Sequence, residues 1–296
     1  MPLIFAAIVS LVAFAATYVA AWRYPRGSAL SPTPSIATAQ AVGEEVAKHS
    51  RLGRFDRRLD PATATGLALT IALISAIGGG IVLAILAYLV RSNGVLLHLD
   101  RDVAQWGHDN AGHVSTQGLT FVTNLAATPT VLVLAVALAV VESVRAPNRW
   151  IVPFLAAVLI GEGLMALIVK DLAHRARPAF DPIAATLGPA FPSGHTTTAA
   201  AFYAGAALLL GRRRGPRAHA ILAAGAVGLA IAVACSRVLL DLHWVSDVVG
   251  GLALGWAWFA VCSVAFGGRL LQFGAGLESG TEAASSLERH KHLTSS

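Results

Sequence analysis

Charged residues are scarce in this chain of 296 residues, because Asp, Glu, Lys and Arg together make up only 13% of it. A soluble domain carries about 25% of these residues, since it must present a wetted surface. Hydrophobic residues reach 55%, and the mean hydropathy is +0.65. The shortage of charge excludes a soluble enzyme and a disordered chain, and it predicts an integral membrane protein.

Cysteine is also scarce, with Cys235 and Cys262 the only two. The composition excludes a disulfide scaffold, and because both cysteines lie in or beside apolar stretches, we expect them to be small buried side chains. The net charge is +6 and the isoelectric point about 9.9. The basic residues lie in short segments between apolar runs rather than on one basic module, so we expect no nucleic-acid partner.

Seven apolar runs are candidates for helices that cross a bilayer, for which about 20 mostly apolar residues are needed. They are residues 3–22, 66–90, 119–141, 151–169, 197–210, 221–235 and 245–266. The fifth and sixth runs are short, and we expect them to extend into small or polar residues that a pocket shelters. The sequence therefore predicts an all-α, polytopic membrane protein with a six-helix core and one extra N-terminal transmembrane helix.

The first run is either a cleaved signal peptide, ending near Ala20 and Ala21, or a retained helix. No Lys or Arg precedes it, whereas Arg23 and Arg26 follow, which favours an uncleaved helix with its N-terminus outside. The predicted organisation is an extra N-terminal transmembrane helix (1–22), a cytoplasmic basic linker (23–65), a six-helix membrane domain (66–267) and a disordered C-terminal tail (268–296).

The basic residues also predict the orientation of the core. Most of the 22 Lys and Arg residues fall in 23–61, 142–149, 211–219 and the tail after 267, which share one side. Basic residues near spans favour the cytoplasm, so these segments are placed inside. The remaining ones are Arg91, Arg101, Lys170, Arg175, Arg177 and Arg237.

Two segments outside the spans are predicted to lie on the membrane surface. The linker contains a basic stretch that either contacts anionic lipids of the inner leaflet or has a regulatory role. On the outer side, four apolar residues recur at helical spacing: Leu96, Leu99, Val103 and Trp106. Because Asp100, Arg101 and Asp102 lie between them, we expect an amphipathic helix on the outer surface.

Three clusters of polar residues border the apolar runs on the predicted outer side. The first runs from Lys170 to Pro178, the second is Phe191-Pro192-Ser193-Gly194-His195, and the third contains Ser236, Arg237, His243 and Asp247. Lys170 and Arg177 are two helical turns apart and share a face if the helix continues that far. The second cluster precedes a helix, whose N-terminus suits an anion. His243 and Asp247 have i,i+4 spacing, which suits an imidazole–carboxylate hydrogen bond.

Each cluster alone has an ordinary explanation. Arginines at membrane edges contact headgroups, Pro-Ser-Gly is a common turn and helix start, and a His–Asp pair is frequently structural. Together, however, they bring cations, two histidines, a carboxylate and a helix N-terminus to one membrane level, which is costly unless it serves a function.

The combined pattern resembles the three-part signature of the type 2 phosphatidic acid phosphatase family. The matching motifs are Lys170-x6-Arg177-Pro178, Pro192-Ser193-Gly194-His195 and Ser236-Arg237-x5-His243-x3-Asp247. That family includes lipid phosphate phosphatases, glucose-6-phosphatase and vanadium haloperoxidases. The resemblance covers roughly residues 96–258, and it implies that the six-helix core is a catalytic phosphatase domain.

The resemblance implies a role for each matched residue. The phosphate oxygens would be held by Lys170, Arg177, Ser193, Gly194 and Arg237. His243 would attack phosphorus to form a phosphohistidine, with Asp247 orienting its ring. His195 would protonate the leaving oxygen and then act as the base for water. No metal and no other cofactor is implied, because three cationic side chains supply the positive charge.

Three further polar residues have less defined roles. Arg175 is an auxiliary candidate for phosphate or headgroup contact. Glu162 lies about 12 Å along the helix from Lys170 at about 1.5 Å per residue. It either contacts a substrate hydroxyl or pairs with Thr or Asn of a neighbouring helix. His174 is expected at the surface, and Asp241 in a loop.

We therefore expect an integral membrane phosphatase that hydrolyses a lipid phosphate or diphosphate at the outer leaflet of the cell membrane. Phosphatidate, phosphatidylglycerol phosphate and polyprenyl diphosphates all fit, membrane lipids are the other expected partners, and the oligomeric state is open. The alternative is a lipid phosphotransferase on the same scaffold. A transporter is disfavoured because no inverted repeat is visible, and a haloperoxidase because the chain is embedded in lipid.

Overall fold

The computed structural model describes residues 1–23, 64–91, 96–110, 112–178 and 188–270, and in these ranges all regular structure is helical. The helices are α1 (Pro2–Arg23), α4 (Ala64–Arg91), α5 (Leu96–Asp109), α6 (His113–Asn124), α7 (Thr128–Arg145), α8 (Ile151–Ala173), α10 (Gly194–Gly211), α11 (Pro216–Leu239) and α12 (Val245–Leu270). The predicted all-α fold is confirmed. Most of the linker and of the C-terminal tail lie outside the described residues.

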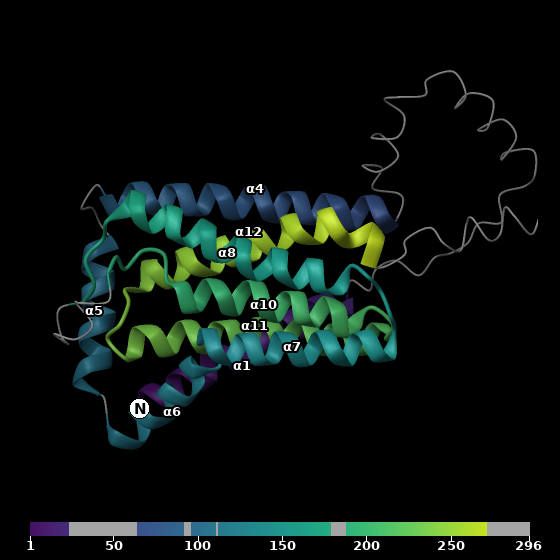
Figure 1. Cartoon of the computed structure of the whole chain (residues 1–296). Coiled ribbons are helices and arrows are strands. Elements are labelled where there is room, and N and C mark those ends of the chain that lie inside the picture. Colours follow the sequence, from purple (N-terminus) through teal and green to yellow (C-terminus); the bar gives the residue numbers. More distant parts are fainter. Residues whose placement is uncertain (24–63, 92–95, 111, 179–187, 271–296) are drawn as a thin grey trace, which may run out of the picture.

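The long helices run side by side, and α5 lies across one end of the bundle (Figure 1). Helix α10 is central, because it packs against α7, α8, α11 and α12. Large side chains such as Phe154 and Phe202 fill one part of the core, while mainly small residues fill the contacts between α10, α11 and α12. At the end crossed by α5, α8 and α11 finish and α10 and α12 begin (Figure 1).

Five helices of the described part are long and apolar enough to cross a membrane: Pro2–Ala21, Thr128–Arg145, Ile151–Ala173, Pro216–Leu239 and Val245–Gly267. The described apolar part of α4, Ala76–Val90, is shorter. Helix α10 is not among the five, because its first turns contain His195 and three threonines. Of these, Thr196 and Thr197 are fully buried by the surrounding helices, so α10 tolerates polar residues that a lipid-facing helix would not.

One predicted run is broken in the structure. Residues 119–141 were expected to form one helix, but α6 ends at Asn124 and α7 begins at Thr128. Pro129, in the first turn of α7, accounts for the break, since proline is tolerated at a helix start and not in its interior. The end of α6 is thereby directed at the third motif.

The N-terminal helix α1 packs along α11, and its N-terminus lies at the end of the bundle crossed by α5 (Figure 1). The Leu3 amide donates to Ser115 Oγ of α6 at 3.2 Å, and the rings of Phe5 and Trp106 of α5 make a T-shaped contact. Helix α5 forms where the amphipathic helix was expected, and its Leu99 and Trp106 are exposed. Asp100, which was expected on the polar side of this helix, is only 1% exposed.

Candidate active site

The three motifs converge at the end of the bundle crossed by α5. Lys170 lies in the last turn of α8 and Arg237 in the last turn of α11. Gly194 and His195 begin α10, and Asp247 lies in the first turn of α12. Each functional side chain is therefore near a helix end, where the chain leaves the apolar part of the bundle.

Arg177 reaches the site from a loop, not from the helical face that it was expected to share with Lys170. Helix α8 ends at Ala173, and His174 follows in the left-handed conformation (φ 47°) as an exposed residue, as expected for its side chain. Arg177 Nη1 donates to the Leu242 carbonyl at 2.8 Å and to His243 Nε2 at 3.0 Å. The first motif is thus bound directly to the third.

His243 is 1% exposed and lies just before α12, whereas Asp247 lies in its first turn. The two residues of the expected His–Asp pair are therefore on either side of the helix start and not on one helical face. Its Nδ1 lies 3.4 Å from Asp247 Oδ2, which also accepts the Trp244 amide at 2.9 Å. Because Arg177 can only donate, Nε2 is the acceptor and the ring proton lies on Nδ1, facing Asp247. Burial lowers the pKa of His243 to about 4, against the opposing effect of Asp247. The ring is therefore neutral near pH 7, with a lone pair on Nε2.

The second motif is held between α8 and α12. The Ser193 amide donates to the Asp247 carbonyl at 3.0 Å, and Ser193 Oγ accepts the Thr196 hydroxyl at 3.0 Å. Gly251 of α12 allows the backbone at Ser193 to come this close to α12, because a Cβ on Gly251 would lie 2.8 Å from the Ser193 carbonyl oxygen. A Cβ on Gly194 would lie 4.0 Å from Lys170 Nζ. The start of α10 thus lies beside the lysine.

Arg237 is buried (7% exposed) without an acidic partner in ion-pair contact among the described residues. Nη1 donates to Thr123 Oγ1, at the end of α6, at 3.3 Å, while Nε is buried and finds no acceptor in the described part of the chain. Lys170 and Arg177 are close enough to repel it, and His195 also lies within electrostatic range. Several cationic donors with unused capacity in one place fit a tetrahedral oxyanion. Thr123 was missed by the sequence reasoning, since no motif marks a threonine more than a hundred residues away.

Arg175 has different partners from the phosphate or headgroup that the sequence suggested. Its Nη2 pairs with Asp100 Oδ2 at 2.6 Å, and its Nη1 with Asp247 Oδ1 at 2.5 Å and Ser246 Oγ at 2.7 Å. Asp100 and Ser246 were also missed as parts of the site. For Asp100 the reason is that a polar residue on an amphipathic helix resembles part of a solvated face.

Glu162 is 5% exposed and accepts a hydrogen bond from the Thr198 hydroxyl of α10 at 2.6 Å. This is one of the two alternatives given for it, pairing with a neighbouring helix. Asp241 lies in the loop after α11, as expected, with φ 59°, and pairs with His108 of α5 at 2.8 Å. Within the described residues, no three His, Cys, Asp or Glu side chains form a group that could hold a metal ion.

The chain is similar in sequence to several known proteins. The chain is 35% identical over 122 residues to a lipid A 1-phosphatase of Rhizobium johnstonii, covering 38% of this chain and 46% of that protein. It is 36% identical over 109 residues to a decaprenylphosphoryl-5-phosphoribose phosphatase of Mycobacterium tuberculosis, covering 36% and 55%. It is 34% identical over 96 residues to phosphatidylglycerophosphatase B of Bacillus subtilis, covering 31% and 46%. The chain thus spans about half the length of the curated relatives it matches.

A solved structure is similar over a larger part of the chain. It is the crystal structure of a transmembrane PAP2-type phosphatidylglycerolphosphate phosphatase from Bacillus subtilis, with 25% identity and a TM-score of 0.58 over 64% of this chain and 94% of that one. Together with the five apolar helices, it indicates a multi-pass membrane protein. Residues 150–270 match the sequence model described as the PAP2 superfamily. This segment contains all three motifs, and the resemblance that they predicted is confirmed.

Proposed function

We propose that this chain is a membrane lipid phosphatase whose phosphate site is formed by the three motifs. The observation that carries the proposal is Arg237: a buried guanidinium whose Nε has no acceptor among the described residues, near two further cations and His243. A buried donor without a partner costs free energy, and a bound phosphate oxygen would satisfy it. The relatives named above, which are phosphatases of lipid and polyprenyl phosphates, support the same assignment.

The proposed reaction proceeds through a phosphohistidine. His243 Nε2 bonds to phosphorus while the bond from phosphorus to the lipid oxygen breaks, and His195 gives that oxygen its proton. Asp247 stabilises the imidazole as it becomes cationic. Water then attacks phosphorus, His195 takes a proton from it, the P–N bond breaks, and inorganic phosphate leaves with His243 restored. Lys170, Arg177 and Arg237 stabilise the charge on the equatorial oxygens in both steps.

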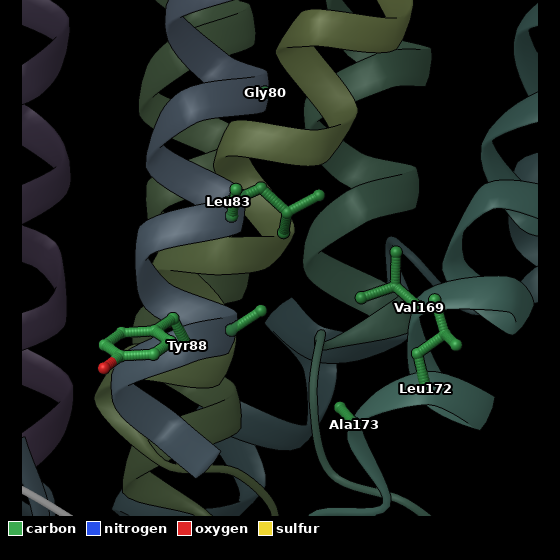
Figure 2. A pocket seen from close by; sticks show the side chains of 8 residues that line it. Gly80, Leu83, Tyr88, Val169, Leu172 and Ala173 are labelled. Atoms are coloured by element: carbon green, nitrogen blue, oxygen red, sulfur yellow. The ribbon is translucent and has the colours of Figure 1, made fainter. Parts of the chain in front are cut away.

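The hydrocarbon part of the substrate has a place beside this site. A pocket of about 640 Å³ opens between α4 and α8, and its lining is almost entirely apolar. Val169 and Ala173 line it within one turn of Lys170 on α8, and Leu83 of α4 points toward α8 (Figure 2). A lipid with its phosphate on Lys170 can therefore lay a chain along this pocket. Unbranched acyl chains and isoprenoid chains are both apolar, so both match this lining.

We place the site on the outer side of the cell membrane. The charge bias puts the basic segments inside, and the motifs lie at the same end of the bundle as the N-terminus (Figure 1). A membrane-impermeant reagent that labels a cysteine introduced at exposed His174 in intact cells, but not one at exposed Arg213, supports this orientation; the reverse labelling contradicts it.

The direct test is phosphate release by detergent-purified protein in EDTA. Wild type, His243→Ala and the matched control His174→Ala, an exposed histidine, are compared at equal concentration. The substrates are phosphatidate, phosphatidylglycerol phosphate, undecaprenyl mono- and diphosphate, lipid A 1-phosphate and decaprenylphosphoryl ribose 5-phosphate. We expect release by wild type and by His174→Ala only.

The outcomes separate the parts of the proposal. Equal release by His243→Ala would refute the nucleophile, and activity lost in EDTA would refute metal independence. If labelled phosphate leaves the lipid only when an alcohol acceptor is added, the chain is a lipid phosphotransferase on the same scaffold.

A further inference from the structure

The surface helix α5 lies outside the segment that matches the PAP2 superfamily, yet it has a buried carboxylate directed at the site. We infer that Asp100 of α5 and Arg175 are positioning residues that act on His243 through Asp247. The inference rests on the proposed function, because it concerns the residues that orient the proposed nucleophile.

Both carboxylate oxygens of Asp100 accept hydrogen bonds, from Ser246 within the third motif and from Arg175. Oδ1 accepts the Ser246 amide at 3.0 Å, and Oδ2 accepts the Ser246 hydroxyl at 2.5 Å and Arg175 Nη2 at 2.6 Å. A carboxylate that is 1% exposed with these three donors is fixed in one orientation. It thereby fixes Ser246, which precedes Asp247 in the chain.

Arg175 connects Asp100 with Asp247. Its two terminal nitrogens contact one carboxylate each, and its guanidinium lies over the Trp244 ring at 5.7 Å from the centroid. The two carboxylate oxygens of Asp247 have different partners: Oδ1 contacts Arg175, and Oδ2 contacts His243 and Trp244. Asp100, Arg175, Asp247 and His243 therefore form one chain of contacts.

This arrangement assigns Arg175 a different task from that of Lys170, Arg177 and Arg237. Both terminal nitrogens of Arg175 contact carboxylates, so its charge is balanced inside the protein and not by phosphate. Asp100 balances part of the charge of Arg175 and so weakens its attraction for Asp247. Arg175 can therefore orient Asp247 while Asp247 keeps its contact with His243. Since the distance from His243 Nδ1 to Asp247 is already 3.4 Å, a small displacement of Asp247 toward Arg175 would break that contact.

The first test replaces Asp100 with Asn, which keeps its size and removes its charge. We expect kcat to fall about tenfold to a hundredfold, the range seen when partners of ligating or reacting groups are removed, with KM unchanged within about twofold. Asp102→Asn on the same helix, where Asp102 is exposed, is the matched control and should retain wild-type kcat. A raised KM with unchanged kcat for Asp100→Asn would overturn the inference, because it would indicate a role in phosphate binding.

A double-mutant cycle separates positioning from general structural support. In an Asp247→Asn background, Asp100→Asn should lower kcat by no more than about twofold, because its path to His243 is already interrupted. An undiminished tenfold or greater loss in that background would overturn the inference. Arg175→Lys, which keeps the charge but cannot contact two carboxylates, serves in the same cycle if Asp100→Asn does not fold. Wild type without phosphatase activity would instead refute the proposed function.

Discussion

Buried arginines at the two ends of the bundle have opposite surroundings. At the end away from α5, Arg212 follows α10, and its Nε pairs with Glu142 of α7 at 2.9 Å. Its Nη2 donates to the carbonyls of Glu142 and Ala146 at 3.1 and 2.5 Å. At the end crossed by α5, Arg237 has a single hydroxyl partner, Thr123, and a buried Nε without an acceptor among the described residues.

The difference shows how a structural charge can be told from a functional one. A buried charge is costly unless it is paired and hydrogen-bonded, and Arg212 meets both conditions inside the protein. Arg237 does not meet them, so its burial is explained best by a ligand that supplies negative oxygens.

The largest effect is expected from replacing each arginine with Leu. Arg237→Leu should lower phosphate release by about 10²–10³-fold, the loss typical of one oxyanion-stabilising donor, with the melting temperature in detergent unchanged or raised. Arg212→Leu should instead lower stability and leave activity unchanged. It leaves Glu142 buried and unpaired, so it should cost about 3–5 kcal/mol of stability while activity per folded molecule is retained.

The Glu142→Leu/Arg212→Leu double variant is the control for this pair. Removing both charges should recover most of the stability that Arg212→Leu loses, because no unpaired carboxylate remains. If Arg237→Leu proves active and unstable while Arg212→Leu proves inactive and stable, the functional contrast between the two ends is wrong.

A second prediction concerns pH, because burial lowers the pKa of His243 to about 4. In the unfolded chain the pKa is near 6.5, so between these values the unfolded state binds a proton that the folded state does not. Stability should therefore fall as pH drops from 6.5 toward 4, by about 1.4 kcal/mol for each pH unit at most. Melting curves of wild type and His243→Asn across this range measure it. Parallel curves for the two proteins would contradict a neutral, buried His243.

The sequence identified the motif residues that lie close together in the structure better than it identified the residues that hold them in place. Residues that the motifs name, such as Lys170, Ser193 and His243, meet at one end of the bundle, because helix ends bring them there. Asp100 and Thr123 could not be predicted, since each contacts a residue distant in the chain, and nothing in the local pattern distinguishes a buried acid on an amphipathic helix from a solvated one. Helix ends were also missed where a single residue decides them, as at Pro129.

A third prediction tests the close contact between α10 and α12 that brings the second motif to Asp247. A Cβ on Gly251 would lie 2.8 Å from the Ser193 carbonyl oxygen, whereas one on Gly225 of α11 would have nothing within 4 Å. Gly251→Ala should therefore cost about 1–3 kcal/mol of stability and lower activity, because the backbone must move apart. Gly225→Ala should be neutral or slightly stabilising, since alanine favours a helix. Equal melting temperatures for the two variants would contradict a close contact between Gly251 and the Ser193 carbonyl.

The smallest effect is expected at the second attachment of α5, the exposed pair between His108 and Asp241. The hydrogen bond to Asp241, aided by its charge, raises the pKa of His108 above 6.5, so the pair contributes below that pH and is lost as pH rises through the raised value. Because exposed ion pairs contribute little, His108→Gln should change kcat by no more than about twofold and shift the melting temperature only slightly, at pH 6 more than at pH 9. His98→Gln, which replaces another exposed histidine of α5, is the matched control and should leave kcat at the wild-type value. A loss of kcat as large as that of Asp100→Asn would mean that attachment of α5 as a whole, rather than the chain of contacts from Asp100 to His243, determines activity.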